Sequence, residues 1–402
     1  MFKLVMSLIF LPDHLETGEV EFQGHPDVFC SLLSAEFIKS LAEIVVKQNE
    51  DINELRTDIN IQGFYSRQSF NFNVAGQINL PLHASLDVLA QREAERLLEK
   101  IGYSEKLDDY QGIEITKRGI TSQSIHLNGT SKENKFADSC VVYGHHIASP
   151  YGLNGTFASL IIGQMMDEYI HHAENQIKGL RPDGKVHVTI KHNQYGYEVK
   201  RVYLSTAHKD EFDRSKMNSL VSDFIIEKRL GNPEVYVNAG GSFAKYFLEA
   251  DSGVSKAKDD VIITGGSHQL GTDRVWGKCL YKASSTLIPY AFALSKAICD
   301  VFETKFASVS AYAEYGQQNA SFQLQEIDPK HENQRSQINF ALTQVPLDRE
   351  GIRNILQMPV NIETYRLFNQ PRNFHNPEMP WKKYNPELVE KIQANIGSKV
   401  FV

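Results

Sequence analysis

A short turn near the N-terminus carries the residue types best suited to chemistry in this chain. It has the sequence Gly24-His25-Pro26-Asp27-Val28. Glycine and proline predict a stiff turn that cannot continue as regular helix or strand, and such a turn holds an imidazole and a carboxylate in fixed directions. Histidine exchanges protons near neutral pH, and aspartate is a hard oxygen ligand for Mg²⁺. For these residues alone, an ordinary surface turn is the competing interpretation.

Further short polar clusters occur at distant points along the chain. One of them, Arg181-Pro182-Asp183-Gly184-Lys185, has an acid and a base two residues apart at the start of an expected strand. The others are Ala137-Asp138-Ser139-Cys140, Leu204 to His208, Asn238, Ala250-Asp251-Ser252-Gly253, Lys256 with Lys258, Gly265-Gly266, Gly277-Lys278 and Lys282. Taken singly, each is also typical of a turn or a solvated charge.

Several common catalytic motifs are missing from the sequence. There is no HExxH and no GxSxG, and the adjacent pairs His145-His146 and His171-His172 point in divergent directions on a helix or strand, so a structural role is favoured. Gly271 to Lys278 imitates a phosphate-binding P-loop, but five residues separate its glycines and Cys279 stands where Ser or Thr would hold Mg²⁺. Any phosphate bound here is therefore not held by a Walker A loop.

Size and composition limit the class of protein. A chain of 402 residues is expected to form two or three lobes. The balance of 42 Lys and Arg against 49 Asp and Glu gives a net charge of −7, which argues against a general nucleic-acid or anionic-membrane binder. The four cysteines are far apart without a CxxC pair, which favours reduced thiols in a cytoplasmic protein.

The hydrophobic start of the chain, Met1 to Phe10, is interpreted as a buried first strand in preference to a signal peptide. It carries a single lysine, and no small-x-small cleavage site follows it. No stretch approaches the about 20 apolar residues of a membrane span, so no membrane segment is expected.

Periodicity predicts a mixed architecture in which strand, strand, helix recurs three times. This favours an α+β fold of three similar α/β lobes, with antiparallel or mixed sheets and helices on one face. We expect domains over residues 1–120, 121–236 and 237–402, and a Pro- and Asn-rich tail, Asn369 to Trp381, that wraps over the surface. Helices are expected over Ser31–Gln48, Leu86–Ile101, Phe157–Ile177, Asp213–Lys228 and Ser285–Phe302, and strands within Ile59–Ile78 (broken at Gly63 and Gly76), Lys185–Ser205, Ala307–Tyr315 and Ala320–Ile327.

In this order, the polar clusters resemble the motifs of the S-adenosylmethionine synthetase (methionine adenosyltransferase) family. The family's Glu-Gly-His-Pro-Asp-Lys motif appears as Gln23 to Val28, with Glu19 as an upstream acid, and its Arg-Pro-Asp-x-Lys and Leu-Ser-Thr-x-His segments are intact at Arg181 to Lys185 and Leu204 to His208. The remaining matches are Ala137-Asp138-Ser139-Cys140 for Gly-Asp-Gln-Gly, Asp251, Lys258, Gly265-Gly266, Lys278, Lys282, and Met379-Pro380-Trp381 for Phe-Pro-Trp. The resemblance spans nearly the whole chain and implies the family's fold.

The resemblance implies a reaction in which the methionine sulfur attacks C5′ of ATP and expels tripolyphosphate, which is then hydrolysed to phosphate and pyrophosphate. A thioether carries no proton, so the protein's part is positioning and fixed positive charge along the phosphates. By resemblance, the catalytic residues are His25, Lys185 and Lys278. The phosphate-binding set is His25, Asp183, Lys185, Asp251, Lys258 and Lys278, and the methionine-binding set is Asp138, Asp251 and Lys282.

The resemblance also implies metal ions and a second subunit. Mg²⁺ would be held by Asp27 and Glu19, and a K⁺ ion often accompanies it in the family. Family members form homodimers or pairs of dimers with sites between subunits. ATP and methionine, or a related thioether, are thus the expected partners.

The chain departs from the family pattern where the family has charges. Its Lys after Gly-His-Pro-Asp is Val28, its Arg before the phosphate-binding Lys is Ala257, and its metal-holding Asp is Ser284. The Gly-Arg-Phe arginine is Ser242, and Arg118 to Ser124 replaces a loop that carries another Asp. Because Lys256 and Lys258 would share a face of a strand, replacing the missing arginine by Lys256 would need a bulge.

Three hypotheses follow. The first is a divergent methionine adenosyltransferase, and the second is a weak or inactive paralogue that binds nucleotide or a catalytic sister subunit. The third, an unrelated ATP-dependent phosphotransferase, does not account for the order of the motifs. Loss of one preorganised charge typically costs about 10²- to 10³-fold in rate, which supports the second hypothesis. The retained residues around His25 and Lys185 favour the first.

Overall fold

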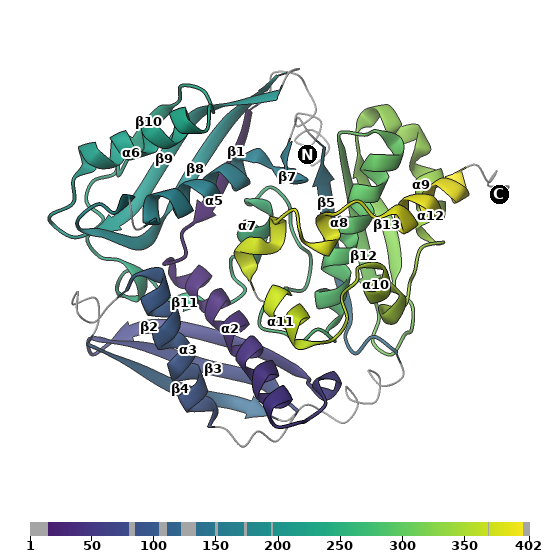
Figure 1. The fold of residues 1–402 in the computed structure, drawn as a ribbon, viewed down its shortest axis with the longest axis horizontal. Helices are drawn as coiled ribbons and strands as arrows, with labels where there is room; N and C mark the ends of the chain where they lie inside the picture. The colour runs from purple at the N-terminus through teal and green to yellow at the C-terminus, as the bar shows by residue number, and fades with distance from the viewer. Residues whose placement is uncertain are drawn as a thin grey trace.

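Three larger β-sheets, each with helices against one face, surround the middle of the described part of the molecule (Figure 1). A small fourth sheet pairs β6 (Gly152–Leu153) with β7 (Thr156–Phe157). The structure is a computed structural model and describes residues 15–79, 85–103, 111–121, 134–148, 152–172, 175–193, 196–368 and 370–396. The expected first strand at Met1–Phe10 lies outside the described residues. The expected α+β fold is confirmed.

The first sheet has four strands in the order β1-β8-β9-β10. They are β1 (Leu15–Glu21), β8 (Leu180–Asn193), β9 (Gly196–His208) and β10 (Glu234–Val237), and only the β9–β10 pairing is parallel within this sheet. Helices α5 (Ala158–His171) and α6 (Arg214–Glu227) cover one face. The α6 helix begins where the sequence predicts, because the Asp213 carboxylate accepts hydrogen bonds from the first-turn amides of Ser215 and Lys216.

The second sheet has the order β11-β2-β3-β4 and carries α2 (Pro26–Lys47) and α3 (Leu86–Ile101). Its strands are β11 (Gly253–Val254), β2 (Thr57–Ser66), β3 (Ser69–Ile78) and β4 (Gly112–Thr121). The predicted breaks at Gly63 and Gly76 are wrong, since both glycines lie inside strands. The chain turns instead at Arg67-Gln68, where both residues have positive φ.

The third sheet is antiparallel, in the order β13-β12-β5. Its strands are β5 (Cys140–Ile147), β12 (Phe306–Ala313) and β13 (Ser321–Ile327). Helix α8 (Ala283–Phe302) packs against β5 and β12, and α9 (Arg335–Leu342) and α12 (Pro386–Ile396) complete this region. The remaining short helices include α7 (Asp259–Thr264), α10 (Arg349–Ile355) and α11 (Ile362–Phe368).

Helix α8 concerns the expectation that no stretch of the chain approaches a membrane span in length and composition. Among the described residues it is long and apolar enough to cross a membrane by length and composition, with a mean hydropathy of 1.2. In this fold, however, 83% of that stretch is buried against the third sheet and its neighbours. The segment is therefore a core helix of the third region.

Each sheet recruits a strand from a distant part of the chain. β1 pairs with β8, β11 pairs with β2, and β5 pairs with β12. The domain ranges 1–120, 121–236 and 237–402 remain a prediction, and the pairings link all three of them. This interleaving brings the distant polar motifs together.

The C-terminal segment after α11 lies at the surface at Gln370 and Asn376 to Glu378, in part as predicted, but it anchors its apolar side chains in the core. It contains two short 3₁₀ helices, Pro371–His375 and Pro380–Lys382. Phe374, Met379 and Trp381 are all buried, and Trp381 Nε1 donates a hydrogen bond to the Phe374 carbonyl at 2.9 Å. The burial of these aromatic and apolar side chains holds the segment against the core. The prediction rested on the Pro and Asn content and did not weigh these side chains.

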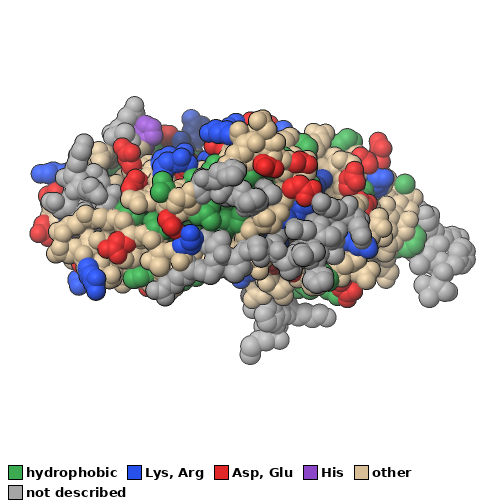
Figure 2. Space-filling model, turned by 90° about the horizontal axis from the view of Figure 1, so that it is seen from below, with side chains coloured by type: hydrophobic (Ala, Val, Ile, Leu, Met, Phe, Trp, Pro, Cys, Tyr) green, Lys and Arg blue, Asp and Glu red, His purple; other side chains and the backbone are tan. Residues whose placement is uncertain are grey.

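Figure 2 shows one face of the molecule, on which Lys and Arg side chains are interspersed with Asp and Glu. This mixture agrees with the near balance of charges in the sequence. The four cysteines are buried and free, as expected for reduced thiols.

Candidate functional site

The Gly-His-Pro-Asp turn connects β1 to α2 and packs directly on the Arg-Pro-Asp segment of β8. The Gly24 amide donates to the Pro182 carbonyl at 3.2 Å, and a Cβ on Gly24 would lie 2.5 Å from the Pro182 carbonyl carbon. Only glycine permits this approach. The two motifs, more than 150 residues apart, therefore meet in one place.

His25 ends the turn and caps α2. Its Nδ1 accepts a hydrogen bond from the Asp27 amide at 3.3 Å, and Pro26 occupies the first helical turn, so α2 begins five residues before the predicted Ser31. An accepting Nδ1 assigns the proton of the neutral ring to Nε2. Burial, followed by the nearby charges of Lys258 and Lys185, lowers the pKa of His25 to about 4. At neutral pH the ring is thus an uncharged donor beside two lysines.

Nine charged or titratable side chains form what we call the His25 cluster. They come from β1, β8, the start of α2 and the segment between β10 and α7, and hydrogen bonds, ion pairs or direct electrostatic interactions connect them. The members are Glu19, Glu21, His25, Asp27, Asp183, Lys185, His187, Asp251 and Lys258.

Two carboxylates of β1 hold the cations of this cluster. Glu19 Oε2 lies 2.7 Å from His187 Nε2 and 3.7 Å from Lys185 Nζ. Its hydrogen bond with His187 is the main cause of a pKa well below the usual range. Glu21, whose side chain is 1% exposed, lies 2.7 Å from Lys258 Nζ. Burial raises the pKa of Glu21, and the neighbouring Glu19 raises it further.

Asp27 and Asp183 are both anchored by backbone amides. Val254 donates to Asp27 Oδ1 at 2.8 Å, and Phe247 donates to Asp183 Oδ2 at 2.6 Å. Burial raises the pKa of each carboxyl, in Asp183 to about 6. Asp251 is exposed, and its charge acts on His25, Asp27 and Asp183.

The raised pKa of Asp183 predicts a pH-dependent stability. An unfolded aspartate has a pKa near 3.8, so between about pH 4 and 6 the folded chain holds more protons than the unfolded chain. The Asp183 contribution is therefore fully present below pH 4 and is lost as pH rises through 6, by at most about 3 kcal/mol. Asp183→Asn should remove the Asp183 share of this slope, while the share of Asp259, whose pKa burial also raises to about 6, remains. Thermal unfolding from pH 4.5 to 7.5 checks it, and an unchanged slope in the variant would contradict it.

A second set of charges lies where β2, β5 and the segment before α8 meet. We call Asp58, Asp138, Lys256, Asp273, Lys278 and Lys282 the Asp58 cluster. Asp58 Oδ1 lies 2.6 Å from Lys256 Nζ, and Asp58 Oδ2 lies 3.4 Å from Lys282 Nζ. Burial alone would raise the pKa of Asp58, but Lys256, Lys278 and Lys282 together lower it.

The outer members of the Asp58 cluster are also paired. Lys282 Nζ lies 3.2 Å from Asp138 Oδ2, and the buried Lys278 forms an ion pair with Asp273. The Gly277 carbonyl accepts a hydrogen bond from the Ile59 amide at 2.6 Å. The backbones of Asp58 and Lys278 form an isolated antiparallel β-bridge. Every lysine named here has a carboxylate partner.

Lys256 and Lys258 point to different clusters, which corrects an assumption from the sequence. β11 ends at Val254, and the chain then turns through Lys256, whose φ is +72°. Lys256 reaches Asp58, whereas Lys258 precedes α7 and reaches Glu21. No bulged strand is needed, because the segment is not a strand.

The residues that replace the missing family charges lie in contrasting environments. Val28 is 1% exposed and belongs to the hydrophobic core, whereas Ala257 and Ser242 are exposed. Ser284 is buried in the first turn of α8, and its hydroxyl has no hydrogen-bond partner among the described residues. In the Arg118–Ser124 loop, residues 122–124 lie outside the described residues, and only the backbone of 118–121 is assigned, to β4.

The structure also adds four residues that sequence reasoning missed. Glu21 and His187 join the His25 cluster, and Asp58 and Asp273 join the other. The alternation of Glu19 and Glu21 along β1 was an available signal, because residues two apart on a strand share a face. Nothing local distinguishes Asp58.

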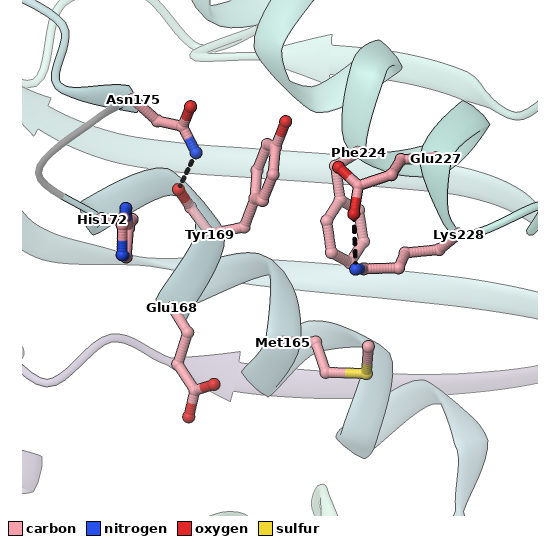
Figure 3. A pocket seen from close by; sticks show the side chains of 8 residues that line it. All are labelled: Met165, Glu168, Tyr169, His172, Asn175, Phe224, Glu227 and Lys228. Atoms are coloured by element: carbon pink, nitrogen blue, oxygen red, sulfur yellow. Dashed lines mark hydrogen bonds and ion pairs between the residues drawn. The ribbon is translucent and has the colours of Figure 1, made fainter.

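A pocket of about 520 Å³ lies elsewhere, between α5 and α6 (Figure 3). The rings of Tyr169 and Phe224 lie 5.3 Å apart in it, and Lys228 pairs with Glu227 at its edge. None of its lining residues belongs to either cluster. We therefore place the candidate site at the charged clusters, where the titratable groups are.

Comparisons with known proteins find the same family that the sequence motifs resemble. A family model described as "S-adenosylmethionine synthetase, central domain" matches residues 156–243. An S-adenosylmethionine synthase of Borrelia garinii subspecies bavariensis is 23% identical over 97% of this chain and 99% of its own. That of Helicobacter pylori is 24% identical over 66% of this chain and 68% of its own.

The fold has a solved counterpart. A structure described as an unusual S-adenosylmethionine synthetase from Campylobacter jejuni superposes with a TM-score of 0.73, covering 95% of this chain and 99% of that chain at 16% identity. The solved structure establishes a shared fold, and the curated relatives match over nearly the whole chain at low identity. The chain is thus similar to the S-adenosylmethionine synthetases in the way expected of a divergent member of that family.

Proposed function

We propose that the chain transfers the adenosyl group of ATP to the sulfur of methionine, or of a related thioether, with release of phosphate and pyrophosphate. One observation carries this proposal. His25, Asp27, Asp183, Lys185 and Lys258 come from three separate segments and meet around one turn.

The His25 cluster suits the departure of a polyphosphate. The thioether sulfur needs no base, so the barrier is lowered by charge that stabilises the leaving phosphates. Lys185 and Lys258 supply that charge, and the neutral His25 ring can donate from Nε2 to a phosphate oxygen. Both lysines already pair with Glu19 or Glu21, which holds them in position before a nucleotide arrives.

The Asp58 cluster has a complementary role in the proposal. Lys278 would bind the far phosphates, and Asp138 with Lys282 would orient the methionine. Lys256, which precedes Ala257 and pairs with Asp58, adds a cation to this cluster and thereby supports the proposed role. We further propose a homodimer or dimer of dimers, in which the His25 cluster of one protomer faces the Asp58 cluster of its partner.

Mg²⁺ fits the residues present only as an ion shared with the nucleotide. No group of three or more His, Cys, Asp or Glu side chains arranged to hold a metal occurs in the described part of the chain. Mg²⁺ commonly takes one or two carboxylates plus phosphate oxygens. Asp27 suits this role, whereas Glu19 Oε2 is engaged by His187 at 2.7 Å. When bound, the ion would neutralise charge on the phosphates. K⁺ is proposed on resemblance alone.

The proposal places the protein in the cytoplasm, without nucleic acid or membrane as a partner. Its test is incubation of the purified protein with ATP, methionine, Mg²⁺ and K⁺, with a parallel measurement of ATP binding. Formation of S-adenosylmethionine above an enzyme-free control is the expected result. ATP binding without product would contradict the proposal and would instead identify an inactive nucleotide-binding paralogue.

A further inference from the structure

Three arginines converge on the ring of Tyr281, outside both charged clusters. The guanidinium carbons of Arg56, Arg353 and Arg349 lie 3.7, 4.6 and 4.9 Å from the ring centroid. Arg56 precedes β2, Tyr281 precedes α8, and the other two are one turn apart on α10. Two parts of the chain thus place three positive charges around an aromatic ring that a third part supplies.

The arrangement is built into the protein and differs from a group of surface cations. Arg56 and Arg349 are each 4% exposed. Arg56 Nη1 donates to the carbonyls of Asn53 and Leu55 at 2.6 and 3.0 Å, and Tyr281 Oη donates to Asn53 Oδ1 at 3.0 Å. Backbone and side-chain bonds therefore hold the ring and its nearest guanidinium in place.

The concentration of charge is costly in the absence of an anion. Contact with an aromatic face contributes about 0.5–2 kcal/mol for each cation, but like charges this close repel one another. Burial, with Arg353 and Arg56 beside it, lowers the pKa of Arg349 to about 10, so the group remains charged at neutral pH. Arg353 Nη2 is buried and has no hydrogen-bond partner among the described residues. A donor of this kind favours an incoming acceptor.

A cavity of about 330 Å³ opens beside these groups. Arg349, Arg353 and Tyr281 line it, together with Asn134, Glu350, Asn354, Pro359 and Val360. Planar guanidinium groups match phosphate oxygens in pairs. The Asn134 amide instead donates to Asp348 Oδ1 at 3.0 Å. The volume accommodates a phosphate group with a small organic part. Glu350 is exposed, and none of the other lining residues named here is acidic.

We propose that this cavity binds a phosphate-type oxyanion, either free phosphate or pyrophosphate or the phosphate of a small organic molecule. None of its lining residues belongs to the His25 cluster or the Asp58 cluster. The site is therefore additional to the proposed adenosyl transfer and does not depend on it. Arg353 is the main ligand, with Arg349 beside it and Tyr281 as the platform.

Equilibrium dialysis with radiolabelled inorganic phosphate and with pyrophosphate, at constant ionic strength in chloride, tests the proposal. Arg353→Gln should weaken binding at least tenfold, whereas Glu350→Gln, which removes the negative charge at the rim, should strengthen it severalfold. Circular dichroism establishes that both variants are folded. Lys185→Ala alters phosphate binding at the His25 cluster, so the part of the binding that depends on Arg353 should remain in that variant.

The contrary results are equally specific. Phosphate binding that is unaffected by Arg353→Gln but lost in Lys185→Ala would place the anion at the His25 cluster and overturn the proposal. Binding of succinate in preference to both phosphates would also overturn it, because it would define a carboxylate site. Absence of adenosyl transfer would leave these outcomes unaffected, so the two proposals fail separately.

Discussion

Lys258→Ala is expected to lower both stability and turnover. Lys258 is the cation that contacts Glu21, whose side chain is 1% exposed, and it also acts on His25 and Asp27. Removing one partner of a fully buried pair costs about 3–5 kcal/mol, and the partial exposure of Lys258 reduces the expected loss to about 2–3 kcal/mol. Loss of a preorganised charge at the leaving phosphates should lower kcat about 10²- to 10³-fold.

A double variant separates these two effects. Glu21→Gln removes the buried charge that loses its lysine, so Glu21→Gln/Lys258→Ala should recover most of the stability. It should not recover turnover, because the cation at the phosphates is still absent. Chemical denaturation and initial rates on the two single variants and the double variant check this. Recovery of turnover in the double variant would contradict the role proposed for Lys258.

Val28→Lys, which restores the family residue, is expected to destabilise the fold strongly. Val28 is 1% exposed and packs in the core formed by α2 and its neighbours. A lysine there must either bury its charge or give up its proton, and the lost valine packing adds to the cost. We expect a loss of about 3 kcal/mol or more in the free energy of unfolding and no gain in turnover.

Ala257→Arg is the matched control for this prediction. Ala257 is exposed, so the restored family arginine should change the melting temperature little. Thermal unfolding of the two variants side by side gives the comparison. Equal destabilisation by both substitutions would show that Val28 is not in the environment described here.

The elements that sequence reasoning predicted well are those with local signals. The amphipathic pattern of Leu86–Ile101 gives α3 with the same bounds, and the Asp213 cap fixes the start of α6. The start of α2 was placed too late because the His25 cap lies inside a motif that was interpreted only as a turn. The motif order also identified the family, since it depends on residue types and spacing alone.

The rest depended on contacts that no local pattern records. Pairing of β1 with β8 places Glu19 opposite His187, and their separation in sequence is far beyond any periodicity. The positive φ of Lys256 sends it to Asp58 rather than to the side of Lys258, and a non-glycine residue gives little warning of that conformation. The division of the candidate residues into two clusters therefore became visible only in the fold.

The most direct test of the central claim follows the fate of both halves of ATP in one reaction. Mass spectrometry of the unaltered protein with ATP, ¹³C-labelled methionine, Mg²⁺ and K⁺ measures labelled S-adenosylmethionine, and parallel assays measure phosphate and pyrophosphate. We predict that the three products form in equal amounts, because attack at C5′ releases the whole tripolyphosphate. Phosphate and pyrophosphate without labelled S-adenosylmethionine, or ADP as the product, would contradict adenosyl transfer to methionine.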